Sequence, residues 1–181
     1  MRYLIIFAAI ILGFGTMSMQ NAGATVDMPS LIAPAGPAAA AVRDTKTAAT
    51  SWVHQCAAMH CGYHEIGPGQ PVKVACYVRN EGIIWNLILA SSPWDQNVPI
   101  VGFVSDDALT APEYGTSCDE YGPGAPSELT WWAHSCPRMA CGYGIINKGD
   151  YYRVIGSASD GWWIAMDFSS PDNHLTGFIH E

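Results

Sequence analysis

The sequence predicts an all-β protein made of two small modules that follow one another along the chain. Three observations support this fold class: an internal repeat, short β-branched segments separated by turn residues, and the absence of helical periodicity. After the N-terminal segment, no stretch keeps apolar residues at a spacing of 3.6 for even three turns. Each module is expected to hold about 55 to 62 residues, arranged as short strands.

Residues 1–24 have the layout of a secretory signal peptide. Arg2 precedes an apolar run at 4–14, and Ala-Gly-Ala at 22–24 forms a small-residue cleavage site. The apolar run is short for crossing a bilayer, although an uncleaved N-terminal anchor is the alternative interpretation. We therefore expect a secreted protein, extracellular or associated with the cell envelope, with no membrane span after cleavage.

Two segments read as linkers. Residues 25–49 are rich in Ala, Pro and Thr and lack aromatic residues, so they bury too little to offset their ordering entropy and predict a flexible stalk. Residues 112–128 hold four acids, three prolines and no base, which predicts a solvated connector. Oxygen ligands for calcium are the alternative there, but no spaced loop motif supports it. The acids considered for that role are Asp106, Asp107, Asp119 and Glu120.

The internal repeat is densest around a pair of cysteines in each copy. Eight of the fourteen positions from Thr50 to Tyr63 are identical to those from Thr130 to Tyr143, at a constant offset of 80. The identities include a tryptophan, a histidine, a methionine and both cysteines. Such density indicates a duplicated module, with the copies at 50–111 and 129–181.

Each copy contains the same series of strand and turn signals. Val72 to Val78 alternates and is β-branched, Asn80 to Gly82 supplies a turn, and Ile83 to Leu89 follows as a second strand. The corresponding segments of the second copy are 151–155, 159–161 and 162–168, with short closing strands at 102–104 and 177–179. Short strands in so small a unit favour a compact, closed or partly closed barrel.

The six cysteines predict disulfides, because the count is even and the compartment is oxidising. The repeat selects one symmetric pairing: Cys56–Cys61 and Cys136–Cys141 occupy equivalent places. Cys76 and Cys118 have no counterparts and are left to pair with each other. Modules of this size need such covalent links, because their own cores are small.

Zinc binding competes with the disulfides in the first copy. His54, Cys56, His60, Cys61 and His64 crowd together there and offer nitrogen and sulfur ligands. The second copy has Ala and Gly where His60 and His64 stand, and thiols in an oxidising compartment pair. We therefore expect no metal and no cofactor.

Several short motifs resemble the bacterial SH3 domain family (SH3b). In the first copy they are Val53 to Cys56, Ile66, Gly69 with Lys73-Val74, Trp85 to Ile88, and Gly102-Phe103-Val104-Ser105-Asp106. In the second copy they are Cys136-Pro137, Ile146, Gly149-Asp150, Val154, Gly161-Trp162-Trp163 and Gly177-Phe178-Ile179. The resemblance covers about two thirds of the chain. It implies two tandem SH3-like β-barrels, a non-catalytic role and, as in several members, binding to peptidoglycan peptides. The chain departs from the family where a usual Arg is His54 or His134.

The candidate ligand-binding residues are aromatic rings and the repeated histidines. His54 and His134 either face a ligand or satisfy their ring nitrogens with local backbone and fix a loop. Tyr63 and Tyr143 are open to the same two interpretations, as are Trp52 and Trp132. Trp94, Trp131 and Trp162 lack clear partners in the repeat and are expected on an exposed contact surface, whereas Trp85 and Trp163 are expected in the core.

Composition and missing motifs exclude several functions. The net charge of −8 and the lack of a basic cluster disfavour nucleic-acid binding. No catalytic or nucleotide-binding motif occurs, and every thiol is assigned to a bridge, so we expect no enzyme. The sequence thus predicts a secreted, non-enzymatic binding protein for cell-envelope peptidoglycan peptides. The alternative is a secreted protein–protein interaction module, an inhibitor or effector, that docks on a protein partner.

Overall fold

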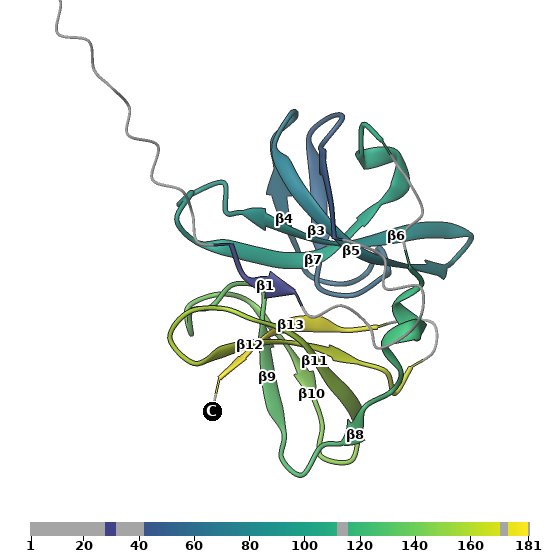
Figure 1. The fold of residues 1–181 in the computed structure, drawn as a ribbon, viewed down its shortest axis with the longest axis vertical. Helices are drawn as coiled ribbons and strands as arrows, with labels where there is room; N and C mark the ends of the chain where they lie inside the picture. Colours follow the sequence, from purple (N-terminus) through teal and green to yellow (C-terminus); the bar gives the residue numbers. More distant parts are fainter. Residues whose placement is uncertain (1–27, 32–41, 112–115, 171–173, 181) are drawn as a thin grey trace, which may run out of the picture.

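The computed structural model describes residues 28–31, 42–111, 116–170 and 174–180, which form strands and two short 3-10 helices (Figure 1). The all-β prediction is confirmed. The expected signal peptide lies outside the described residues. The elements in chain order are β1 (Ser30–Leu31), β2 (Arg43–Lys46), β3 (Ser51–His54), β4 (Tyr63–Ile66), β5 (Pro71–Asn80), β6 (Ile83–Ser91), β7 (Pro99–Ser105), η1 (Asp106–Ala108), η2 (Cys118–Tyr121), β8 (Ala125–Pro126), β9 (Trp131–His134), β10 (Tyr143–Ile146), β11 (Tyr151–Ser157), β12 (Trp162–Asp167) and β13 (Thr176–His180).

The strands form two antiparallel sheets with the same internal order. The first sheet runs β2-β5-β6-β7-β3-β4. The second runs β1-β11-β12-β13-β9-β10, and β8 pairs with β11 as β2 pairs with β5. The repeat in the sequence is therefore a repeat in topology, and it extends upstream to β2 and β8. Among the described residues, strand pairing closes neither sheet into a barrel.

The long hairpin of each copy turns through residues with positive φ. Asn80 pairs with Ile83, so Glu81 and Gly82 form a two-residue loop with φ of 54° and 74°. Two successive positive φ values are typical of the type I′ turn, whose twist matches that of the strands. In the second copy Asp160 and Gly161 have φ of 60° and 75°. Glycine is favoured at the second position because it adopts this conformation without strain.

Both long hairpins also contain a bulge at the same repeat position. The register of β5 on β6 slips at Ala75, and that of β11 on β12 slips at Ile155. A bulge bends its strand and increases the local twist. The two extra residues are buried and belong to one hydrophobic cluster, which contains residues from both sheets.

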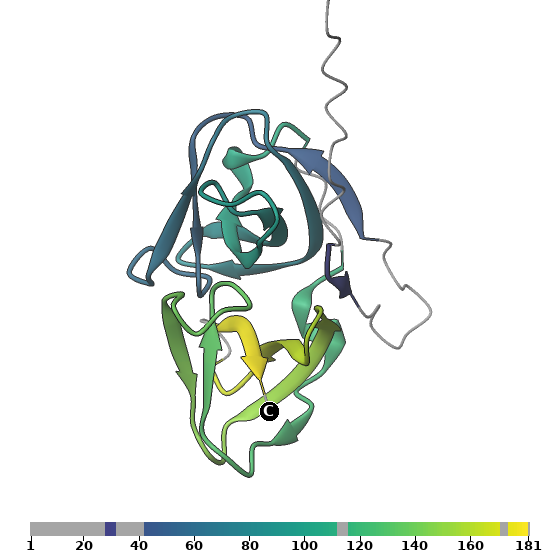
Figure 2. The ribbon, with the colours of Figure 1, turned by 90° about the vertical axis from the view of Figure 1, so that its left-hand side faces the viewer.

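That cluster is a core shared by the two modules. Trp85 and Phe103 come from the first sheet, and Ile164 and Phe178 come from the second. All four side chains are less than 2 % exposed. Figures 1 and 2 show the two sheets stacked on one another, so the modules pack together as one unit.

Two reciprocal backbone hydrogen bonds tie the modules together. The N–H of Val101 donates to the carbonyl of Ser135 at 3.2 Å, and the N–H of Thr176 donates to the carbonyl of Gln55 at 2.8 Å. Val101 corresponds to Thr176, and Gln55 corresponds to Ser135. The contact is therefore made twice with exchanged roles, as in an isologous dimer interface.

The three disulfides have the predicted pairing. Cys56–Cys61 and Cys136–Cys141 close equivalent loops, with Cα–Cα distances of 5.7 and 5.8 Å. Cys76–Cys118 joins β5 to η2, with a Cα–Cα distance of 4.9 Å.

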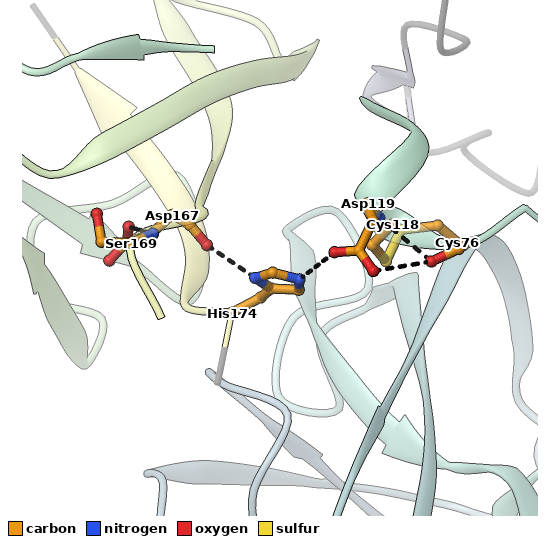
Figure 3. Close-up of polar contacts among 7 residues, drawn as sticks. Cys76, Cys118, Asp119, Asp167, Ser169 and His174 are labelled. Carbon is orange, nitrogen blue, oxygen red and sulfur yellow. Dashed lines mark hydrogen bonds and ion pairs between the residues drawn. A yellow bond between two sulfur atoms is a disulfide. The ribbon is translucent and has the colours of Figure 1, made fainter. Parts of the chain in front are cut away.

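The described part of the acidic connector is docked rather than solvated. Besides the Cys76–Cys118 disulfide, Tyr77 donates its N–H to the carbonyl of Thr116 at 3.0 Å, and Tyr121 is buried in the shared core. Figure 3 shows a further contact across the molecule, in which His174 lies between Asp119 and Asp167. Its Nε2 lies 3.1 Å from the Asp119 carboxylate, and its Nδ1 lies 3.2 Å from the Asp167 carbonyl.

The segment expected as a stalk also contributes strands. β2 pairs with β5 along its whole length, from Arg43 opposite Val74 to Lys46 opposite Pro71. β1 pairs with the end of β11 in the second sheet. The prediction of a flexible stalk is therefore wrong for these residues. Their composition buries too little surface to offset the entropy lost on ordering, but the hydrogen bonds of strand pairing add further stabilisation.

The repeated glycine of β7 and β13 is required by close backbone packing. A Cβ on Gly102 would lie 2.5 Å from the carbonyl oxygen of His54, and one on Gly177 would lie 2.8 Å from that of His134. Both distances are below contact, so each strand crosses its neighbour only without a side chain at this position.

We expect Gly177→Ala to lower the free energy of unfolding by about 1–3 kcal/mol, the usual effect of overpacking. Gly142→Ala is the matched control, since its Cβ would meet no atom within 4 Å. Urea denaturation followed by tryptophan fluorescence measures both. Equal midpoints for the two variants would contradict the close packing.

Candidate ligand-binding site

The two copies form equivalent pockets from the same residue types. Their volumes are about 280 Å³ in the first module and about 310 Å³ in the second. The first is lined by Ala49, Thr50, Ser51, Trp52, His54, Met59, Trp85, Ser105, Asp107 and Ala108. The second is lined by Thr130, Trp131, Trp132, His134, Met139 and His180. A threonine, a tryptophan, a histidine and a methionine at an offset of 80 make the common frame.

Local structure explains why these side chains meet. Residues two apart on a strand point to the same face, so Trp52 and His54 of β3 share one side of the sheet. Met59 comes from the loop that the Cys56–Cys61 disulfide closes. The same construction recurs in β9 and in the loop closed by Cys136–Cys141. The disulfides thus hold the methionine-bearing loops beside the strands.

The histidines lie inside the pockets and fix these loops. His54 and His134 are 3 % and 2 % exposed. Their Nδ1 atoms lie 3.3 Å and 3.1 Å from the carbonyls of Cys61 and Cys141. A carbonyl only accepts, so Nδ1 carries the hydrogen and Nε2 is the acceptor of the neutral ring. Of the two interpretations of these histidines, hydrogen bonding to the local backbone therefore applies to the Nδ1 atom in both copies.

The remaining ring nitrogen of His134 is an unsatisfied polar atom. Its Nε2 is buried and has no hydrogen-bond partner among the described residues. The His134 ring packs edge-on against Trp162, with centroids 5.7 Å apart, as the His54 ring packs against Trp85 at 5.3 Å. Burial lowers the pKa of His54, and the hydrogen bond to the carbonyl of Cys61 opposes that shift.

Exposed aromatic and methionine side chains form the pocket rims. Trp52 and Trp132 are 47 % and 57 % exposed, and Met59 and Met139 are exposed as well. Trp132 stacks on Tyr143 with centroids 5.4 Å apart and an interplanar angle of 25°. Large apolar side chains exposed together mark contact surfaces.

The rims differ in charge between the copies. Ser105 and Asp107 line the first pocket, where the serine hydroxyl donates to the carboxylate at 2.5 Å. Glu65 pairs with Trp52 across the strands. In the second module Ile145 pairs with Trp132, and His180 takes the place of Ser105. The first rim is therefore acidic, and the second is more apolar and carries a histidine.

The tryptophans expected on an exposed contact surface differ in how exposed they are. Trp94 is exposed, away from both pockets, with its ring 4.9 Å from that of His64. Trp131 is half-buried beside the second pocket. Trp162, predicted to be exposed, is only 8 % exposed, whereas Trp163, predicted in the core, is 40 % exposed.

The strand register gives the reason for this exchange. Trp85 pairs with Ser105, and Trp162 pairs with His180, so Trp162 is the counterpart of Trp85. Placing Trp163 in the core beside Trp85 shifts this strand by one residue, which exchanges the two faces. The side chain of Tyr63 lies outside what the structure describes, and Tyr143 is exposed on the second rim.

Sequence reasoning missed the methionines, Asp107 as a pocket residue, and His180. Met59 and Met139 recur at the repeat offset, so the repeat itself held the signal for them. Asp107 and His180 have no such signal, because they reach the pockets from η1 and β13 only through the fold.

The clusters considered for metals do not form a ligand set of free side chains. Among the described residues, Cys56, His60 and Cys61 bring their ligand atoms within 4.8 Å of one another, but both sulfurs are bonded in the disulfide. Three of the four acids considered for calcium have separate partners: Asp106 accepts from Asn86, Asp107 accepts from Ser105, and Asp119 contacts His174.

Comparison with protein-family models, with curated proteins and with solved structures finds no match to this chain. Within the described ranges, no helix has the length and hydrophobicity needed to cross a membrane.

The histidines make stability depend on pH. Burial lowers the pKa of His54 and of His64 from the ordinary value of 6.5. Below pH 6.5 the unfolded chain binds protons that the folded chain resists, so stability falls as the pH drops from about 6.5 toward the folded-state pKa values. His64 also contacts Ser135 of the other module, with Nε2 2.5 Å from Oγ.

We expect the urea midpoint to be lower at pH 5 than at pH 7.5, and His64→Gln to reduce that difference. His60→Gln, at an exposed position, is the control. The assignment to His64 is wrong if both variants keep the full pH dependence of the parent protein.

Proposed function

We propose that this chain is an exported, non-enzymatic binding protein whose two SH3-like modules recognise cell-envelope peptides of the peptidoglycan type. The observation that carries the proposal is the pocket of Trp, His and Met, built twice at the same offset and rimmed by exposed tryptophan. A frame of threonine, tryptophan, histidine and methionine kept in both copies of a duplicated module provides two candidate ligand sites.

Local features support the SH3-like assignment. Most of the resembling motifs lie on strands, whereas Gly69, Gly149 and Gly161 lie in turns, and β7 leads directly into a 3-10 turn, η1, over Asp106–Ala108. Leu109 then forms an antiparallel bridge with Thr47 near the start of the module. This contact brings the two ends of the first module together, as a small barrel-like domain requires.

Peptide ligands suit the chemistry of the pockets. Aromatic rings and adaptable methionine side chains bind apolar stems, and a fixed polar group orients the ligand. The acidic rim of the first pocket, with Asp107 and Glu65, would attract an amino group. Peptidoglycan peptides offer both apolar side chains and free amino or carboxylate groups, so the two pockets would bind different parts of such a ligand.

Disulfides and histidine contacts support export and a binding role. Three disulfides are typical of an oxidising compartment, in agreement with the signal-peptide layout of residues 1–24. The Nδ1 atoms of His54 and His134 contact backbone carbonyls rather than carboxylates, and the adjacent cysteine sulfurs are not nucleophiles.

A protein partner is the second candidate, favoured by charge. The net charge of −8 and the acidic rim of the first pocket favour association with a cationic protein surface.

We expect the oxidised protein to bind soluble peptidoglycan fragments, and Trp52→Ala/Trp132→Ala to weaken binding at least tenfold, as for a central hot spot. Isothermal titration calorimetry measures this, with circular dichroism to verify folding. Trp94→Ala is the matched control, because that ring is exposed but lies outside both pockets.

No binding at several hundred micromolar fragment would overturn the envelope-peptide proposal and direct the search to a protein partner. Equal loss in the Trp94 and the pocket variants would remove the pockets as the site.

A further inference from the structure

The second module contains an open groove. At the equivalent place in the first module, a segment of that module covers the sheet. The groove has a volume of about 840 Å³ and is lined by residues of β8, β9 and β11 and by the β8–β9 loop. Its apolar walls are Leu129, Trp131, Tyr152 and Val154. The equivalent hollow of the first module, beside Thr45 and Val74, measures only about 190 Å³.

The segment after β7 accounts for this difference. Leu109 is buried in the core of the first sheet and bridges Thr47 in antiparallel fashion. Thr110 donates its N–H to the carbonyl of Lys46 at 2.9 Å, and Ala48 donates its N–H to the carbonyl of Ala108 at 2.8 Å. A short extended segment thus continues the sheet beyond β2 and covers the apolar residues behind it.

In the second module, no described segment covers the same edge. Ser127 corresponds to Thr47, because the two residues make the same backbone hydrogen bonds. Thr47 donates its N–H to Gln70 and accepts from Gly69, and Ser127 donates its N–H to Asp150 and accepts from Gly149. The N–H of Glu128, which corresponds to that of Ala48, has no hydrogen-bond partner among the described residues. Val154 and Tyr152 are only half-buried, whereas their counterparts in the first module are buried.

The ends of the groove carry opposite charges. In the first module Lys73 pairs with Asp44 at 2.9 Å. In the second module Arg153 corresponds to Lys73, and Gly124 corresponds to Asp44. The guanidinium of Arg153 therefore lacks this carboxylate, and it has no ion pair within the described part of the chain. Glu128 lies toward the opposite end of the groove.

We propose that this groove binds an extended peptide segment of a partner protein, added antiparallel to β8. The segment would place a leucine-sized side chain where Leu109 lies in the first module and a carboxylate further toward its C-terminus. Antiparallel addition directs the C-terminal end of the peptide to Arg153 and its N-terminal end to Glu128, which matches both charges. Edge-strand addition of this kind combines main-chain hydrogen bonds with one side-chain pocket.

The test uses the four-residue peptide Ala-Leu-Thr-Ala, which copies residues 108–111, begins with a free amine and ends in a free carboxylate. It is titrated into isotopically labelled, oxidised protein and followed by NMR. We expect a saturable downfield shift of the Glu128 amide, while the Ala48 amide, already bonded, stays in place. Aspartate in place of the leucine should abolish the shift, because an aliphatic side chain is no longer buried.

Charge variants test the direction of the peptide. Arg153→Gln should raise the dissociation constant for the free-acid peptide about threefold, the scale of an exposed ion pair, and leave that for the amidated peptide unchanged. Lys73→Gln is the matched control in the first module and should change neither.

Three outcomes would overturn the proposal: no shift at Glu128 at several millimolar peptide, equal binding of the aspartate peptide, or concentration-dependent shifts at Glu128 without peptide. The last would assign the groove to a second copy of the chain. None of them depends on the peptidoglycan pockets, whose Trp52→Ala/Trp132→Ala variant should bind the groove peptide normally.

Discussion

The shared hydrophobic core is the constraint on which the rest of the structure depends. A module of about 60 residues buries a smaller fraction of its surface than a larger domain does, and its stability alone is marginal. Here Trp85 and Phe103 of one sheet pack in the same cluster as Ile164 and Phe178 of the other. The bulges at Ala75 and Ile155 place their extra residues in this cluster. The duplicated modules therefore stabilise each other, and the repeated bulges contribute to this packing.

Packing of this kind decides how the two pockets act together. Two sites on a flexible tether sample many separations, whereas sites on packed modules have one. The reciprocal bonds from Val101 to Ser135 and from Thr176 to Gln55 fix the relation between the modules, and the docked connector with Cys118 and Asp119 reinforces it. Simultaneous binding at both pockets then selects ligands whose epitopes match that fixed separation.

The sequence was sufficient where the signal was local or was repeated. The all-β class, the Cys56–Cys61 and Cys136–Cys141 loops, and the Gly82 and Gly161 turns follow from turn chemistry and from the repeat. The assignment of Trp162 failed because the second hairpin is shorter. Six residues separate Val78 from its partner Trp85, whereas three residues separate Ala158 from Trp162, to whose carbonyl Ala158 donates its N–H. The constant offset of the repeat therefore ends at this turn, and nothing local in the sequence shows by how much.

The contacts between modules could not be predicted, because they depend on residues that pattern alone treats as linker or surface. Nothing in the composition around Thr116 and Cys118 distinguishes a docked segment from a solvated one except the unpaired cysteine of the repeat. Likewise, only the fold shows that Lys73 and Arg153 are equivalent while Asp44 is replaced by Gly124.

Duplication with retained frames and altered rims is the physical basis for different roles in the two copies. The buried histidines of the pockets are under packing constraints, because His54 and His134 hold the disulfide loops and contact the core tryptophans Trp85 and Trp162. Rim positions such as Glu65 and Ile145 have no such constraint and differ. The same contrast holds at the sheet edge, where Leu109 completes one core and the other lies open beside Arg153. Each copy keeps the residues that its packing requires. Surface residues that packing does not constrain can differ, and the two copies can then bind different ligands.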